Sequence, residues 1–215
     1  MNERPILFSA PMVRALLDGS KTQTRRAMKI QPTHFNPVGV PRLAQSVGNS
    51  EVIACPYGQP GDQLWVREAF AFTDAHMPRY EGSIEYKADN KCLAVSCNDL
   101  IDVPHRCDPR PFEGPWKPSI HMPRWASRIT LEIVSVRIER LNDISRGDAM
   151  AEGCPFPNMA KGDDPRKWYA ELWNAINGPG SWDKNPWVWV VEFTRHNAEL
   201  CGGTSATNAV LNGET

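Results

Sequence analysis

Long apolar runs are absent from this sequence of 215 residues. The longest, Trp187 to Val191, has five residues, so no segment is expected to span a bilayer. The N-terminus lacks a basic start followed by an apolar stretch, which predicts a cytoplasmic protein without a secretory signal. Hydrophobic residues at 41% and charged residues at 23% are ordinary for a globular chain, and they exclude a wholly disordered or fibrous protein.

Excess charge is lacking as well, because the net charge is −1, which argues against gross electrostatic binding to nucleic acid. The charge is nevertheless unevenly distributed. Residues 1–30 carry six basic and two acidic side chains, and residues 116–146 carry six basic and three acidic ones. If these two segments meet in space they could form a local anion site. The alternative is that both are solvated faces without a ligand.

Paired CxxC motifs are also missing. Without a secretory signal, the six cysteines are expected to be free thiols rather than a disulfide framework. Four potential zinc ligands fall within sixteen residues, but their spacing is not that of a standard zinc site. We therefore predict neither a metal nor a cofactor. These four residues are Cys92, Cys97, His105 and Cys107.

Three helices are expected, at 10–18, 143–152 and 165–177. Ser145 with Asp148 predicts a capping box at the start of the second helix. Asp164 followed by a proline is typical of the start of the third helix. The apolar stripe expected on the third helix consists of Trp168, Leu172 and Ile176.

Strands are expected at residues 6–8, 64–68, 129–138 and 187–193. In the third of these, apolar residues alternate in one phase up to Ile133 and in the opposite phase from Val134, which predicts a β-bulge. The last strand is almost continuously apolar, which indicates a central position in the sheet.

The remaining segments are expected to be irregular. Residues 31–61 are rich in proline and glycine and predict a long loop, and residues 70–115 predict an irregular insertion with one strand near 84–86. The tail, 196–215, is small and polar and is expected to be disordered. The prediction is therefore an α+β fold: one domain over residues 1–195, built on a small mixed β-barrel with flanking helices.

Three features could carry chemistry. Lys21 and Thr24 follow the first helix, and in a helical turn this spacing brings both side chains to one side, where a lysine of lowered pKa could activate the hydroxyl. Arg25 and Arg26 could supply the cation that lowers it. The alternative interpretation is that these lysine, threonine and arginine residues belong to an ordinary surface loop and carry no chemistry.

The second feature is Glu68, which shares a strand face with two apolar residues and should therefore point inward. A buried carboxylate needs a partner or a raised pKa, so Glu68 is either a site residue or half of an ion pair with an arginine.

The third feature is the segment 116–128, whose aromatic and basic side chains suit base stacking and phosphate contacts. Its candidate binding residues are Trp116, Arg124, Trp125 and Arg128, with packing as the alternative role for the tryptophans.

Together these features resemble a known family. The run from Gly19 through Lys21 and Thr24 to the two arginines resembles the GxKxxTxR motif of the ASCH domain, a family of PUA-like β-barrels, and it follows the first helix as it does there. The run from Gly61 to Glu68 resembles the second block of that family. The chain also resembles long ASCH-like proteins of phages and prophages. This similarity is weak over residues 70–115 and absent in the tail, residues 196–215.

The resemblance implies three possible functions. The first is a module that binds RNA or a modified nucleotide in a cleft built on the motif. The second is an amidohydrolase that deacetylates N(4)-acetylcytidine, in which Lys21 activates Thr24 for attack and Glu68 handles the proton of the leaving amine. The third is a phage scaffold or interaction protein. The sequence does not decide between them, and it leaves the oligomeric state open.

Overall fold

The structure is a computed structural model that describes residues 1–32, 34–35, 41–44, 50–74, 82–95, 100–101, 115–155 and 164–196. Its strands are β1 (Glu3–Leu7), β2 (Gln23–Ala27), β3 (His34–Phe35), β4 (Pro41–Ala44), β5 (Ser50–Val52), β6 (Gln63–Arg67), β7 (Phe70–Asp74), β8 (Gly82–Tyr86), β9 (Cys92–Val95), β10 (Leu100–Ile101), β11 (Thr130–Arg140) and β12 (Trp187–His196). Its helices are α1 (Ala10–Leu17), α2 (Arg146–Ala151) and α3 (Pro165–Asn177), with short 3₁₀ turns at Ser119–His121, Arg124–Ala126 and Leu141–Asp143.

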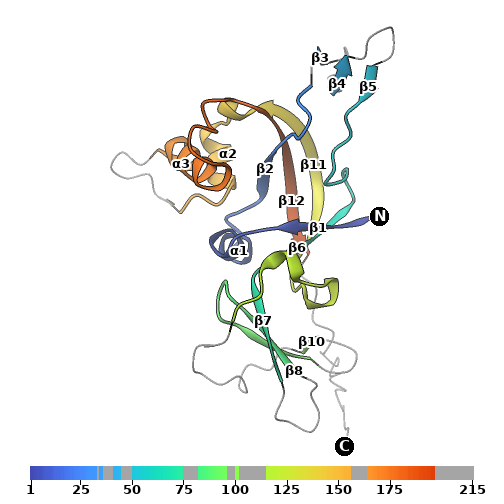
Figure 1. Ribbon diagram of the computed structural model, residues 1–215, viewed down its shortest axis with the longest axis vertical. Helices are drawn as coiled ribbons and strands as arrows, with labels where there is room; N and C mark the ends of the chain where they lie inside the picture. The colour runs from blue at the N-terminus through green and yellow to red at the C-terminus, as the bar shows by residue number, and fades with distance from the viewer. Residues whose placement is uncertain are drawn as a thin grey trace, which may run out of the picture.

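The main sheet has five strands in the order β1-β6-β11-β12-β2. β1 and β6 are parallel, and the other neighbours are antiparallel. The register of β11 against β12 shifts between Ile133 and Ser135, which confirms the predicted bulge, and the two long strands curve across the molecule in Figure 1. β12 lies between β11 and β2, so its predicted central position is confirmed as well.

Sheets combined with a few helices confirm the α+β class. Among the described strands the main sheet does not close on itself, because β1 and β2 remain its two edges. Its core consists of alternating apolar side chains, for example Leu64 and Val66 on β6 and Val191 and Phe193 on β12. In the described part of the chain, no helix is long and apolar enough to cross a membrane.

The two segments expected to be irregular contain sheets. Within 31–61, β3, β4 and β5 form a small antiparallel sheet, and within 70–115, β7 to β10 form another in the order β10-β9-β8-β7. The expectation of a loop and an irregular insertion was therefore wrong for the described residues, whereas the strand expected near 84–86 is confirmed as part of β8. The other strands have only two to five residues each, so their alternation is too short to stand out in the sequence.

The helices follow their predicted bounds closely. The capping box of Ser145 and Asp148 is formed at the start of α2, and Asp164 caps α3. The buried face of α3 is one residue off the predicted stripe: Tyr169 and Trp173 are buried, whereas Ile176 is 53% exposed. Both faces carry apolar residues at a spacing of four, and contact with the sheet decides which one is buried.

The cysteine expectation needs one correction. Cys55 is a free thiol as predicted. Cys92, however, is disulfide-bonded, so the expectation of free thiols is wrong there. The other three candidate zinc ligands (Cys97, His105 and Cys107) lie outside the described residues, as does the predicted tail beyond His196.

Candidate functional site

The polar stretch after α1 forms a strand, not a helical turn. Residues 23–27 are β2, which pairs with β12 at the edge of the main sheet (Figure 1). The helical turn expected to bring Lys21 and Thr24 together was therefore wrong, because Thr24 lies within β2 and Lys21 forms an isolated β-bridge with Glu152 just before it. The sequence concealed this strand because its inward-facing residues are charged rather than apolar.

The side chain of Lys21 is completely buried, and its ammonium group donates three hydrogen bonds. Its ammonium donates to the backbone oxygen of Gln23 at 2.8 Å, to the backbone oxygen of Glu152 at 2.9 Å and to Oε2 of Glu152 at 2.8 Å. The side chains of Lys21 and Glu152 are 0% and 2% exposed. An ion pair of this kind contributes more to defining the structure than to net stability, but losing one partner leaves a buried charge.

Arg25 extends this cluster. Its guanidinium, also 0% exposed, donates to Glu152 at 3.3 Å and to Glu139 at 3.0 Å, and it lies 3.3 Å from a carboxylate oxygen of Asp148. Arg137 approaches the same Asp148 and Glu139, so the two basic segments of the sequence do meet in space. They meet around carboxylates, which compensate most of their charge.

Thr24 and Arg26 complete the motif. Thr24 is 2% exposed, and its hydroxyl makes no hydrogen bond within the described part of the chain. The guanidinium of Arg26 lies 5.3 Å from the centre of the Phe8 ring and donates to the backbone oxygen of Leu7. Such cation–π contact lets a cation lie on an apolar core without a carboxylate beside it.

Two pockets adjoin the motif. The first, here called the motif pocket, has about 50 Å³ of free volume. The second, the helix pocket, has about 440 Å³ and lies between α1 and α3. They share Met12, Glu152 and Leu172 in their walls, so they lie side by side, and together they are called the groove. The motif pocket is lined by Met12, Thr24, Arg25, Arg26, Ala27, Glu152, Tyr169, Leu172, Trp173, Ile176 and Asn177.

Burial sets the protonation behaviour of the site. Desolvation lowers the pKa of Lys21, an effect that Glu152 opposes and that the positive charges of Arg26 and Arg25 reinforce. Desolvation raises the pKa of Tyr169 well above its usual value, so its phenol stays neutral. Thr24 lines the motif pocket with a hydroxyl that has no hydrogen-bond partner among the described residues, whereas Lys21, whose proton is held less tightly than usual, is not among the residues that line either pocket.

Glu68 belongs to a different cluster. It is buried as predicted, and both of its oxygens accept from Arg128 at 2.9 Å. Arg128 also binds Asp89 through two bonds of 2.9 Å and lies 4.0 Å from the ring centre of Tyr86. Burial raises the pKa of Glu68, and Arg128 opposes this. Of the two interpretations of Glu68, the ion pair is the one the structure shows, and none of its contacts within the described residues reaches Lys21 or Thr24.

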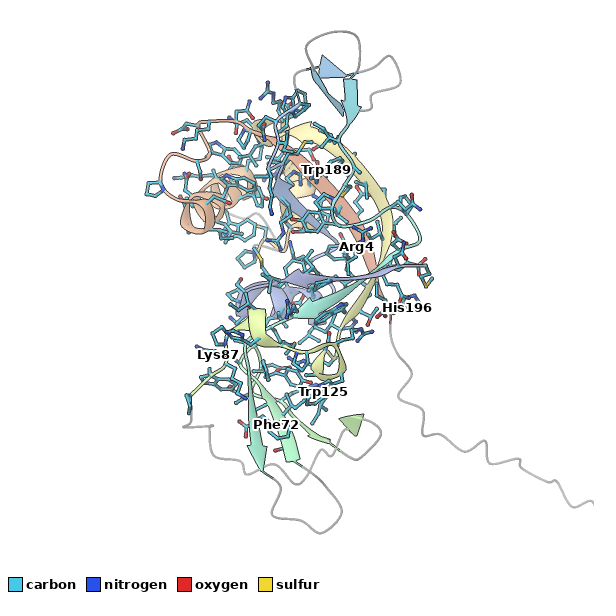
Figure 2. All side chains as sticks on the ribbon, turned by 45° about the vertical axis from the view of Figure 1, so that its right-hand side comes forward. Arg4, Phe72, Lys87, Trp125, Trp189 and His196 are labelled. Carbon is cyan, nitrogen blue, oxygen red and sulfur yellow. The ribbon has the colours of Figure 1, made fainter. Side chains whose placement is uncertain are left out.

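The candidate residues of 116–128 are likewise apart from the motif, and none lines either pocket. Arg128 is internal. Arg124 pairs with Glu3 on the surface, and Trp125 is 56% exposed and meets the edge of Phe72 at 6.3 Å (Figure 2). Trp116 is half-buried, next to the residue that bridges to β7. Only Trp125 and Arg124 therefore present the exposed aromatic and basic surface that was expected.

Sequence reasoning missed two residues of the motif cluster. Glu152, at the end of α2, is the carboxylate that Lys21 and Arg25 share, and it lies 131 residues from Lys21. Gly153 follows with a φ of +92°, and a Cβ there would lie 2.9 Å from Cβ of Ala15 and 3.3 Å from Cβ of Lys21. Glycine is thus needed for the close approach that brings Glu152 to the motif.

No protein-family model, no curated protein and no solved structure matches the chain. The resemblance to the ASCH domain consequently remains a prediction that depends on the motif residues themselves.

Proposed function

We propose that the chain is a PUA-like module that binds RNA or a modified nucleotide in the groove formed by the motif pocket and the helix pocket. The observation that supports this most is that the polar residues Thr24, Arg25 and Arg26 of β2 line the same pocket as the aromatic residues Tyr169 and Trp173 of α3. Buried polar groups beside aromatic side chains are typical of sites that hold the polar part of a nucleotide, and the larger helix pocket has room for its base.

The dimensions of the groove agree with this ligand. The helix pocket, at about 440 Å³, lies within the range of small-molecule sites, which is about 300–1,000 Å³. Its walls combine the apolar side chains of Met12, Leu172 and the half-buried Trp168 with the polar side chains of Arg14 and Ser20. An indole beside polar donors suits the stacking and edge recognition of a single unpaired base.

Amidohydrolysis of N(4)-acetylcytidine is the second candidate, and the lowered pKa of Lys21 favours it. In this mechanism Thr24 attacks the acetyl carbonyl, the amide C–N bond breaks, and the threonine proton passes to the amine of cytidine, which leaves. Water then hydrolyses the acyl-threonine to acetate and the free hydroxyl. Glu152, which contacts Lys21, replaces Glu68 as the carboxylate of this proposal. Binding is the leading proposal because the Lys21 ammonium already donates to three oxygens, which favours its protonated form.

The deciding experiment is calorimetric titration with the four nucleosides, their 5′-monophosphates and a short single-stranded RNA. Thr24→Val removes the hydroxyl at nearly constant volume, and we expect it to weaken binding about tenfold. Thr22→Val is the matched control, because Thr22 is exposed on the same stretch. Absence of binding by every ligand, or equal binding by both variants, would refute the proposal.

The enzymatic candidate is tested in parallel by following cytidine release from N(4)-acetylcytidine. Release by the wild type and its loss in Thr24→Ala would establish turnover. A scaffold protein, the third interpretation, would bind none of these ligands and would tolerate both threonine substitutions.

A further inference from the structure

Three buried nitrogen atoms around the motif pocket have no hydrogen-bond acceptor within the described part of the chain. They are Nε of Arg25, Nε of Arg26 and Nε1 of Trp173, and all three residues line this pocket. Arg25 and Trp173 are 3% and 5% exposed. Buried donors in folded proteins are almost always satisfied, so three of them at one pocket indicate a ligand that supplies acceptors.

Both arginines are held in place through their terminal nitrogens. The terminal nitrogens of Arg25 bond to Glu152 and Glu139, and a terminal nitrogen of Arg26 bonds to the backbone oxygen of Leu7. These bonds fix both guanidinium groups, so that their Nε atoms are pre-organised rather than free to turn away. Preorganised donors lose little entropy on binding, which favours a tight contact with a small group.

The charge around the pocket favours an anion. Among the described residues, no carboxylate lies within ion-pair distance of Arg26 to compensate its charge. The one carboxylate in the pocket wall, Glu152, is already bonded to Lys21 and Arg25, which offsets its repulsion. A negatively charged ligand would therefore be attracted to this pocket, where it would balance the positive charge of Arg26.

The free volume of about 50 Å³ admits a group of a few atoms but no nucleobase. A tetrahedral group with several acceptor oxygens matches three donors that approach from two elements, β2 and α3. The adjoining helix pocket leaves room for the remainder of a nucleotide.

We propose that the motif pocket is a phosphate subsite in which Arg25 Nε, Arg26 Nε and Trp173 Nε1 bind the terminal phosphate of a nucleotide. This inference depends on the proposed function, since it assigns the phosphate end of that ligand. The phosphate has two possible sources: a free nucleoside 5′-monophosphate or the 5′-phosphorylated end of an RNA strand.

The test compares cytidine with cytidine 5′-monophosphate, and a 5′-hydroxyl trinucleotide with its 5′-phosphorylated form, by calorimetric titration. We expect the phosphorylated member of at least one pair to bind about tenfold or more tightly. The pair that shows the larger difference identifies the source. Inorganic phosphate alone is the third probe, and we expect it to compete with the phosphorylated ligand.

Two variants assign the effect to the pocket. Arg26→Lys keeps the charge but removes the Nε donor, and Trp173→Phe keeps a ring but removes Nε1. Each is expected to reduce the preference for phosphate, measured as the ratio of the affinities for the phosphorylated and the unphosphorylated ligand, about tenfold. The controls are Arg195→Lys and Trp182→Phe, which lie outside the motif pocket. Because Trp173 is a core residue, Arg26→Lys, which is only half-buried, decides the outcome if the tryptophan variant does not fold.

The outcomes separate this inference from the proposed function. If nucleosides bind as tightly as their phosphates and Thr24→Val weakens both, the nucleotide site stands and the phosphate subsite is wrong. If a phosphate preference exists but survives in both pocket variants, the subsite is also wrong. If nothing binds, both proposals fail.

Discussion

Replacing Glu152 by glutamine tests the central claim about the motif cluster. This carboxylate, 2% exposed, is bonded to the fully buried side chains of Lys21 and Arg25. A glutamine has one acceptor oxygen and turns an NH₂ group toward the other cation. Breaking a buried ion pair by removing one partner costs about 3–5 kcal/mol of unfolding free energy. For a chain of this size that corresponds to a fall of about 6–20 °C in Tm.

The same variant should show a characteristic pH dependence. Burial already lowers the pKa of Lys21 below its ordinary value of 10.5, and Glu152→Gln removes the charge that opposes this shift. Between the folded pKa and 10.5 the unfolded chain then binds more protons than the folded one, so stability rises with pH in that window. The deficit of Glu152→Gln relative to wild type should therefore shrink as the pH is raised from 7 to 10.

The assay is urea denaturation followed by circular dichroism at several pH values. Glu3→Gln is the matched control, since Glu3 pairs with Arg124 on the surface, where both side chains are 42% exposed, and its loss should cost less than about 1 kcal/mol. Adding Lys21→Met to Glu152→Gln should restore part of the stability. A Glu152→Gln variant within about 1 kcal/mol of wild type at pH 7, or with a deficit independent of pH, would refute the reasoning.

Three further substitutions test other parts of the fold by thermal and urea unfolding. Arg128→Ala should cost about 3–5 kcal/mol because it leaves the buried carboxylate of Glu68 unpaired, and an effect below about 1 kcal/mol would contradict this. Ser145→Ala should cost about 1 kcal/mol through loss of the capping box, and an unchanged Tm would show that the cap contributes nothing. Gly153→Ala should cost at least about 1–2 kcal/mol because of its positive φ and the contact with Ala15, whereas a neutral result would mean that α2 can move away.

The parts of the fold that could be predicted from the sequence are those determined by local pattern. The alternation of Leu64, Val66 and Glu68 gives the buried face of β6, and all three are buried. The phase change after Ile133 gives the bulge in β11. In both cases the apolar side chains themselves mark the inner face, so no knowledge of distant partners is needed.

The candidate site was harder to predict because its inner face is charged. The stretch that leads into β2 buries Lys21, and β2 buries Arg25, although such residues normally indicate solvent exposure. Their burial depends on Glu152 and Glu139, more than 110 residues away. A sequence pattern does not reveal partners at that distance. The motif itself was found by resemblance, whereas its strand conformation and its true carboxylate partner emerged only from the tertiary contacts.

The near-neutral net charge of the chain leads to a last prediction about salt. A single phosphate bound by Arg26 and neighbouring buried donors releases few counterions, so the slope of log K against log[salt] should be about −1 or shallower. Binding of an RNA strand along a basic surface, such as that around Arg124 and Trp125, would neutralise several phosphates and give a slope several times steeper. Titration of the 5′-phosphorylated trinucleotide from 50 to 300 mM salt distinguishes the two. A steep slope that Arg26→Lys leaves unchanged but Arg124→Ala reduces would move the RNA site from the groove to that surface.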